Sequence, residues 1–532
     1  MTRERLYLFD TTLRDGAQTQ GVDFNVQDKH AIAQALDRIG IDYVEGGWPG
    51  ANPTDSSFFS APPALARAKL IAFGMTKRSG RSAANDPGLA AVLDAKAQGA
   101  CLVGKSWDFH VTLALGIGLE ENLALIRESI AAAAAKGEAM FDAEHFFDGY
   151  KANPDYALAC LEAAQAAGAR WIVLCDTNGG TLPHEVERIV GEAVRRVPGE
   201  RLGIHAHNDT ENAVANSLAA VRAGVRQVQG TLNGLGERCG NANLVSLIPS
   251  LMLKPFYAER FEIGVGGDDL RQLTQLSRLL DELLNRAPNL HAAYVGDAAF
   301  AHKGGLHVSA VEKDPRTYEH VPPESVGNRR HILVSDQAGR SNILARLREA
   351  GIELDPRHPK VARLLEEVKE REFQGYAYDG AEASFELLAR RALDGVPDYF
   401  RLQSFRVIDE RRWNARGDLV TLSEATIKVD VGGSMQMTVA EGNGPVNALD
   451  TALRKALTPV FPELETIRLT DYKVRILTPQ DGTKAVTRVM IETSDGAGQS
   501  WSTVGVSTNV IDASYNALHD SLTYKLLRSG RH

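Results

Sequence analysis

The sequence predicts an α/β protein: a TIM, or (β/α)₈, barrel, followed by a helical linker region and a C-terminal α+β domain. Eight short apolar runs recur in the first half of the chain, and each is followed by a small or polar cluster and an amphipathic helical stretch. Strands that alternate with helices form parallel βαβ units, and eight units of roughly 30 residues match the ~250 residues of a (β/α)₈ barrel. The runs lie at residues 6–9, 43–44, 70–73, 100–103, 139–141, 171–174, 202–204 and 225–228.

A doubly wound open sheet is the alternative fold. It predicts a glycine-rich GxGxxG phosphate loop after the first strand, and no such loop follows residue 9. The barrel fold predicts that polar residues follow the apolar runs, because the catalytic groups of barrel enzymes lie at the carboxyl ends of the strands. Polar residues do follow six of the eight runs, at residues 11–16, 45–50, 142–145, 176–178, 205–209 and 233–241. We therefore expect a single active site at this end of the barrel.

A divalent-metal site is predicted from His205 and His207, which follow the seventh run. Residues i and i+2 of an extended segment point the same way, so both imidazoles can reach one ion. Asp15, after the first run, adds a carboxylate, and Asn241 is available as a weaker fourth ligand. Such a set leaves positions open for substrate and water, but it does not choose among Zn, Mn, Co and Mg. Two structural histidines are the alternative.

Four further residues are candidates for chemistry. Arg14 can stabilise a developing oxyanion or can simply form a salt bridge with Asp15 or Glu45. Glu144 can act as an acid or base, or can order a metal ligand. Thr177 can bind a substrate carboxylate or can cap the next helix. His302 lies outside the barrel, in a glycine-containing loop that a neighbouring chain can carry over the barrel mouth.

Three domains are expected: a catalytic barrel at residues 1–265, helical linker subdomains carrying His302 at 266–395, and an α+β regulatory domain at 396–532. Helical spacing appears at residues 268–287, 340–350 and 358–371, and strand-like alternation at 425–431, 435–439, 470–476 and 485–493. Residues 446–453 reappear in diverged form as 511–518, with the Ala-x₃-Ala-Leu frame kept. Each copy follows a strand pair, so two β-β-α units in tandem are expected.

The composition sets limits on partners and compartment. The net charge of −9 argues against nucleic acid or an anionic membrane as the main partner. The four cysteines form no C-x-x-C pair, and a reducing, cytoplasmic compartment fits them. No apolar segment has the form of a signal peptide or the length of a membrane span.

Three motifs of the chain resemble those of the Claisen-condensing metalloenzymes, the family of 2-isopropylmalate, homocitrate and citramalate synthases with hydroxymethylglutaryl-CoA lyase as a relative. They are DTTLRDG at residues 10–16, HAHND at 205–209 and GLGERCGNA at 234–242. The resemblance covers nearly the whole chain, and the last domain resembles the amino-acid-sensing domain of the synthases. Residues 46–53 and 300–308 most resemble the citramalate-forming branch.

This resemblance implies an acyltransferase that condenses acetyl-CoA with pyruvate and water to give (R)-citramalate and CoA, on the way to 2-oxobutyrate and isoleucine. It also implies a cytoplasmic homodimer, with isoleucine as a feedback effector. The roles it implies are a divalent metal on Asp15, His205, His207 and Asn241, enolate stabilisation by Arg14, and acid–base work by Glu144 and by His302 from a second subunit.

Other functions stay open from the sequence. Residues 142–148 read DAEHFFD, where isopropylmalate synthases usually have a Ser-Pro-Glu-Asp-like sequence, and the choice of 2-oxoacid rests on the branch because one methylene changes binding by only ~1–3 kcal/mol. An isopropylmalate or homocitrate synthase is therefore the first alternative. A metal-dependent acyl-CoA lyase is another, although lyases do not need the long last domain. Two further alternatives are a biotin-dependent carboxyltransferase, which could use Lys105 as a carbamylated metal bridge, and a non-catalytic amino-acid sensor.

Overall fold

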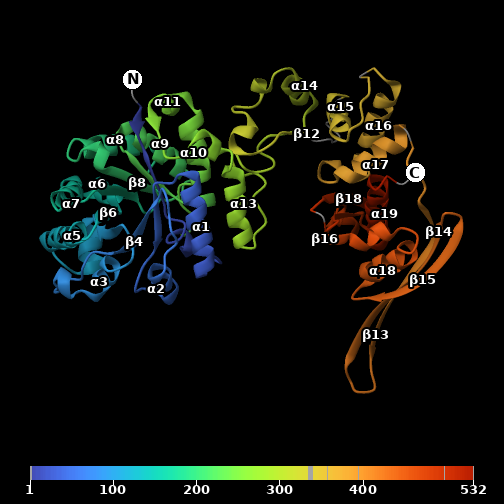
Figure 1. Cartoon of the computed structure of the whole chain (residues 1–532), viewed down its shortest axis with the longest axis horizontal. Helices are drawn as coiled ribbons and strands as arrows, with labels where there is room; N and C mark the ends of the chain where they lie inside the picture. Colours follow the sequence, from blue (N-terminus) through green and yellow to red (C-terminus); the bar gives the residue numbers. More distant parts are fainter. Residues whose placement is uncertain (1–2, 333–339, 356, 394, 497, 531–532) are drawn as a thin grey trace. The chain divides into compact units, whose positions relative to one another are not determined.

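The computed structural model describes residues 3–332, 340–355, 357–393, 395–496 and 498–530. The chain forms two compact units (Figure 1). The first comprises the chain up to Phe300 together with Val321–Arg330, and the second comprises Ala301–His320 together with the chain from His331 onward. The expected boundaries at residues 265 and 395 fall inside these two units and stay predictions.

Eight parallel strands close into the expected barrel in chain order, so the predicted fold class is confirmed. The sheet closes where β9 pairs with β2, with Tyr7 opposite Gln227 and Asp10 opposite Gly230. The strands are β2 (Tyr7–Asp10), β3 (Tyr43–Gly47), β4 (Lys69–Met75), β5 (Gly99–Lys105), β6 (Glu138–Glu144), β7 (Trp171–Asp176), β8 (Leu202–Ala206) and β9 (Gln227–Gly230). The helices of the outer layer are α1 (Val26–Ile39), α2 (Pro53–Ser60), α3 (Pro87–Leu93), α5 (Leu119–Ala134), α6 (Phe146–Ala152), α7 (Pro154–Ala166), α8 (Pro183–Val194), α9 (Ala213–Ala223) and α10 (Leu244–Leu253).

Local sequence signals account for the bounds of α1. The Asn25 side chain accepts a hydrogen bond from the backbone N–H of Asp28, and the Asp28 carboxylate accepts one in return, which makes a capping box. Gly40 ends the helix in the left-handed conformation at φ 97°. Between these ends Ile32 and Leu36, four residues apart, are buried on one face.

Large side chains fill part of the barrel interior. Phe9, Tyr43, Phe73 and Trp171 belong to one buried cluster there. Tyr43 and Trp171 are the first residues of their strands, and the Trp171 indole donates a hydrogen bond to the Tyr43 hydroxyl at 3.2 Å. Because this part of the interior is packed, the space for a ligand lies towards the carboxyl ends of the strands.

The segment after the barrel differs in detail from the sequence prediction. The expected helix at 268–287 is two helices, α12 (Gly267–Leu270), which ends with Arg271 as its C-cap, and α13 (Leu273–Leu283). The expected loop at 300–307 contains the short strand β11 (Ala301–His302) and the start of α14 (Gly305–Lys313). Further helices are α15 (Arg340–Glu349), α16 (Pro359–Phe373) and α17 (Glu382–Leu393).

The last part of the chain contains the expected tandem repeat, and each copy has three strands rather than two. The first copy is β13 (Phe400–Trp413), β14 (Leu419–Val431) and β15 (Ser434–Gly442), followed by α18 (Pro445–Leu457). The second is β16 (Arg468–Ile476), β17 (Thr487–Ser494) and β18 (Ser500–Ser507), followed by α19 (Val510–Arg528). The sequence prediction missed β13, most of whose side chains are exposed, so it lacks the buried–polar alternation that marks a half-buried strand.

Among the described residues no single helix is long and apolar enough to cross a membrane. One bent pair of helices, Asp108–Leu115 with Leu119–Ala134, is together long and apolar enough for a membrane span, by length and composition only.

Candidate metal centre and substrate pocket

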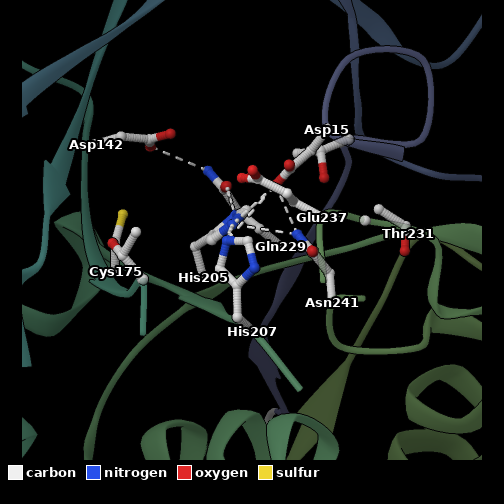
Figure 2. Close-up of polar contacts among 12 residues, drawn as sticks. Asp15, Asp142, Cys175, His205, His207, Gln229, Thr231, Glu237 and Asn241 are labelled. Atoms are coloured by element: carbon white, nitrogen blue, oxygen red, sulfur yellow. Dashed lines mark hydrogen bonds and ion pairs between the residues drawn. The ribbon is translucent and has the colours of Figure 1, made fainter. Parts of the chain in front are cut away.

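Three of the predicted ligands converge at the carboxyl ends of the barrel strands. Asp15 follows β2, His205 lies in β8 and His207 follows β8, and all three side chains are buried. The Nε2 atoms of His205 and His207 are 3.4 Å apart and lie 3.1 and 4.0 Å from Asp15 Oδ2. Figure 2 shows the two imidazoles and the carboxylate turned towards one another. One ligand atom from each residue lies within 4.8 Å of the others, which is close enough for a single ion.

The hydrogen bonds around His205 fit a cation at this point. His205 Nδ1 faces Gln229 Oε1 at 2.8 Å, an acceptor, so Nδ1 carries a hydrogen and Nε2 is the nitrogen that can offer a lone pair to a metal. Nε2 lies 3.1 Å from Asp15 Oδ2, and a proton or a metal ion between these two atoms would satisfy both. Burial by itself would lower the pKa of His205, but the hydrogen bond and charge of Asp15 raise it. The surroundings of His205 therefore favour positive charge.

The other two ligands are in the protonation states that metal binding requires. Burial would raise the pKa of Asp15, but Arg14 and the two histidines hold it well below its usual range. Burial, together with neighbouring His205, lowers the pKa of His207 to about 3. A carboxylate and a neutral imidazole are the forms that coordinate a divalent ion.

Asn241 lies beside these ligands. Its Nδ2 donates to Asp15 Oδ2 at 2.7 Å and lies 3.2 Å from His205 Nε2, while its buried Oδ1 has no hydrogen-bond partner. Turning the amide about its last bond would direct Oδ1 at the centre, where a cation would satisfy it. Gly236 keeps this space open, since a Cβ there would lie 2.0 Å from Asn241 Oδ1. The donor set fits a divalent metal of mixed nitrogen and oxygen ligation.

Arg14 is fixed at the wall of a cavity of about 290 Å³ beside these ligands. Its Nε donates to Glu45 Oε2 at 2.6 Å, its Nη1 lies 3.6 Å from Asp15 Oδ1, and its guanidinium carbon lies 3.9 Å from the centre of the Phe73 ring. Burial would lower the pKa of Arg14, but Glu45, Asp15 and Asp142 raise it, so the group stays charged. The sequence offered two hypotheses for Arg14, a salt bridge and stabilisation of an oxyanion. The salt bridge is present, and it holds the guanidinium at the cavity where an oxyanion would form.

Glu144 and Thr177 also line this cavity. Glu144 forms an ion pair with Lys105 from the neighbouring strand β5. Thr177 Oγ1 accepts a hydrogen bond from the backbone N–H of His145 at 2.9 Å. Thr177 does not cap the next helix, because α8 begins at Pro183 with Leu182 as its N-cap. Their catalytic and substrate-binding roles stay predictions.

His302 belongs to the second unit of the chain. It is buried there, and its Nε2 lies 3.1 Å from Glu319 Oε1. A carboxylate beside an imidazole fixes the orientation of the ring. Its acid–base role stays a prediction.

Two residues at the centre were not singled out from the sequence. Gln229 holds His205, and Asp142 lies within reach of Gln229 on the opposite side, with its Oδ1 3.4 Å from Gln229 Nε2. Gln227 and Gln229 alternate in β9, and both are buried. Two polar side chains on the inward face of a barrel strand are the signal by which the sequence points to them.

A closed eight-stranded barrel with a buried Asp–His–His cluster at its carboxyl end defines a (β/α)₈ protein with a candidate metal site. Comparison with known families narrows this class. The HMGL-like family matches residues 5–279, the homocitrate synthase post-HMGL domain-like family matches 294–374, and the LeuA allosteric (dimerisation) domain matches 379–526. The chain belongs to the HMGL-like family, within the group of the (R)-citramalate synthases.

Two synthases of similar length support this assignment. The chain is 54% identical over 525 residues to an (R)-citramalate synthase of Geobacter sulfurreducens, covering 98% of both chains. It is 51% identical over 528 residues to an (R)-citramalate synthase of Aquifex aeolicus, covering 99% of this chain and 98% of the relative. A solved hydroxymethylglutaryl-CoA lyase from Pseudomonas aeruginosa is 18% identical with a TM-score of 0.45, over 54% of this chain and 95% of the lyase.

Proposed function

We propose that this protein is an acetyl-CoA-dependent acyltransferase that condenses acetyl-CoA with pyruvate and water to give (R)-citramalate and CoA. The observation that carries the proposal is the 54% identity to an (R)-citramalate synthase over 98% of both chains. The barrel cavity supports it, because a small anionic 2-oxoacid fits a space of about 290 Å³ lined by Arg14, Asp15, His205 and His207.

Asp15, His205 and His207, with Asn241 after its amide turns, hold a divalent metal in this proposal. A metal bound there would polarise the keto group of the 2-oxoacid and offset the charge that develops on its oxygen. Thr177 binds the substrate at the edge of the same cavity, where its hydroxyl can donate to a carboxylate. The ligand set accepts Zn, Mn, Co or Mg, so elemental analysis of the purified protein is needed to identify the native metal.

Arg14 stabilises the enolate of acetyl-CoA. The reaction removes a proton from the acetyl methyl group, and the negative charge collects on the thioester oxygen. A guanidinium already fixed by Glu45 at 2.6 Å meets this charge without having to reorganise, and buried donors of this kind are the most effective. The carbanion then attacks the keto carbon, and hydrolysis of the thioester releases CoA.

Glu144 and His302 share the proton transfers. Glu144 lines the cavity and forms an ion pair with Lys105, and a carboxylate there can orient a water molecule or accept a proton from it. His302 is proposed to reach the site from a partner subunit, with Glu319 fixing the ring. Both roles are tested by the pH dependence of kcat/KM in Glu144→Gln and His302→Asn.

An assay of CoA release with a panel of 2-oxoacids tests the proposed function. We expect the highest kcat/KM with pyruvate, ahead of 2-oxobutyrate, 2-oxoisovalerate and 2-oxoglutarate, with (R)-citramalate as the product by chiral chromatography. Turnover without biotin excludes a carboxyltransferase. If pyruvate gave no CoA release while 2-oxoisovalerate or 2-oxoglutarate did, the protein would be an isopropylmalate or homocitrate synthase, and the proposal would be wrong.

The C-terminal region is proposed to regulate a homodimer in response to isoleucine. The match of residues 379–526 to the LeuA allosteric (dimerisation) domain supports both parts. The reaction would then serve isoleucine biosynthesis in the cytoplasm. Isoleucine should lower the rate and raise the thermal unfolding temperature, with leucine as the control amino acid. No effect of isoleucine on either quantity would refute the proposed effector.

A further inference from the structure

A buried chain of hydrogen-bonding groups runs behind the metal ligands, from His205 through Gln229 to Asp142. Gln229 Oε1 lies 2.8 Å from His205 Nδ1, and Gln229 Nε2 lies 3.4 Å from Asp142 Oδ1. The three residues come from β8, β9 and β6, and each side chain is buried. Figure 2 shows Gln229 between the His205 ring and the Asp142 carboxylate.

The orientation of the Gln229 amide decides which nitrogen of His205 carries the hydrogen. With Oε1 towards Nδ1, the hydrogen is on Nδ1, and Nε2 keeps the lone pair that a metal needs. With the amide turned over, an NH₂ group would face Nδ1, and the hydrogen would move to Nε2. His205 would then direct an N–H at the centre, 3.1 Å from Asp15 Oδ2. Metal binding therefore requires one of the two amide orientations.

Asp142 is the neighbour that can enforce this orientation. A carboxylate only accepts hydrogen bonds, so it draws the NH₂ side of Gln229 towards itself whichever oxygen faces the amide. Gln229 Nε2 also lies 3.5 Å from Gln227 Oε1. Gln227 is itself an amide, and its own Nε2 has no hydrogen-bond partner. It can therefore present either a donor or an acceptor to Gln229, and it cannot select between the two orientations.

We propose that Asp142 is a positioning residue of the metal centre: through Gln229, it holds His205 in the tautomer whose Nε2 is free to bind a divalent cation. This proposal rests on the metal role assigned in the proposed function. It gives the buried carboxylate in β6 a function that needs no direct contact with the metal. Residues that orient a metal-bound histidine in this way typically change metal affinity by 10–100-fold when they are removed.

Titration of the metal-free protein with CoCl₂, followed by visible absorption without substrates, tests the proposal. Gln229→Leu keeps the side-chain length and removes both hydrogen bonds, so we expect Co²⁺ affinity to fall roughly 10–100-fold. Asp142→Val should weaken it by roughly tenfold or more. Asp142→Asn replaces the acceptor-only carboxylate by an amide that can face Gln229 with either side, so it should also weaken Co²⁺ binding. Gln227→Leu, which removes a similar amide from the same strand, is the matched control and should stay within about threefold of the wild type.

The double variant shows whether Asp142 acts through Gln229. We expect Asp142→Val to have no further effect in a Gln229→Leu chain, because the amide that it orients is gone. Circular dichroism and thermal unfolding of the metal-free proteins exclude a folding defect as the cause of weak binding. The altered visible spectrum of bound Co²⁺ in Gln229→Leu would report the changed His205 ligand.

Several results would overturn the proposal. Wild-type Co²⁺ affinity in both Asp142→Asn and Asp142→Val would mean that Gln229 keeps its orientation without Asp142. Additive losses in the double variant would mean that Asp142 acts independently of Gln229. Unchanged binding in Gln229→Leu beside a wild type that binds Co²⁺ would refute this proposal alone. A wild-type protein that binds no Co²⁺ would refute the proposed metal role together with it.

Discussion

Replacement of Arg14 by glutamine tests the centre of the proposed reaction. Arg14 makes a 2.6 Å hydrogen bond to Glu45, lies 3.6 Å from Asp15 and stacks on Phe73 at 3.9 Å, so its charge is fixed before the substrate arrives. Loss of one such donor at a developing oxyanion costs about 2.7–4 kcal/mol, or 10²–10³-fold in kcat. We expect this loss in Arg14→Gln at saturating acetyl-CoA and pyruvate.

The same change has a limited effect on folding, for a reason visible at Glu45. Removing one partner of a buried ion pair usually costs about 3–5 kcal/mol, because a charge is left uncompensated. Burial already raises the pKa of Glu45 to about 7 in the presence of Arg14. Without the guanidinium it rises further, so Glu45 takes up a proton near neutral pH and avoids part of that cost. We expect a loss of about 1–3 kcal/mol in the free energy of unfolding.

Steady-state CoA release and urea unfolding measure the two effects separately. Arg14→Lys is the matched control: it keeps the charge but loses the planar group that both donates to Glu45 and stacks on Phe73. Its kcat should lie between those of the wild type and Arg14→Gln. A folded, metal-loaded Arg14→Gln enzyme that keeps kcat within tenfold of the wild type would refute the role of Arg14 at the enolate.

Three further predictions concern the metal and pH. His207→Ala should lower Co²⁺ affinity more than about 100-fold, which is more than the loss expected for a residue that only orients a ligand. EDTA should inactivate the wild type until Mn²⁺ or Co²⁺ is restored. Activity that survives complete chelation would contradict a metal enzyme. Gly236→Ala should displace Asn241, since its Cβ would lie 2.0 Å from Oδ1, and a Co²⁺ titration indistinguishable from the wild type would exclude Asn241 as a ligand. Burial raises the pKa of Asp10 from 3.8 to about 7, although the hydrogen bonds from Thr12 lower it. Between pH 3.8 and 7 the folded protein therefore holds a proton that the unfolded chain releases, and the free energy of unfolding falls as the pH rises through this range. In urea unfolding from pH 4.5 to 6.5, Asp10→Asn should remove a slope of about 1.4 kcal/mol per pH unit, and parallel profiles would show that Asp10 ionises normally.

The barrel and the convergence of Asp15, His205 and His207 were predictable because each depends on a local pattern. The eight apolar runs overlap the eight barrel strands, and the three residues follow from the rule that functional groups gather at the carboxyl ends of the strands. The strands β13 and β18 were missed. The side chains of β13 are mostly exposed, and β18 buries Val504 and Gly505 in succession, so neither shows clean alternation.

The contacts between side chains of different strands were beyond the sequence. Asp142 was visible as a polar residue at a strand end, but its contact with Gln229 joins residues 87 positions apart. The sequence offers both Asp15 and Glu45 as carboxylates with which Arg14 can pair, but the stagger of β2 and β3 decides that Glu45 makes the 2.6 Å hydrogen bond. Such stagger is set by packing of the whole barrel, which no short window of sequence contains.

The sequence by itself determined which residue types follow which strand, and therefore that carboxylate, imidazole and guanidinium groups gather at one end of a barrel. Periodicity and chain order are sufficient for this, because parallel strands with helical crossovers bring all their carboxyl ends to the same side. Only the tertiary structure decided the rest. Closure of β9 onto β2 brings Asp15 and Asn241 to 2.7 Å across 226 positions, and the pairing of β9 with β8 sets Gln229 behind His205. The tautomer of His205 and the orientation of Arg14 depend on hydrogen bonds of 2.8 and 2.6 Å to side chains from other strands, which the packed barrel fixes and the local chain does not.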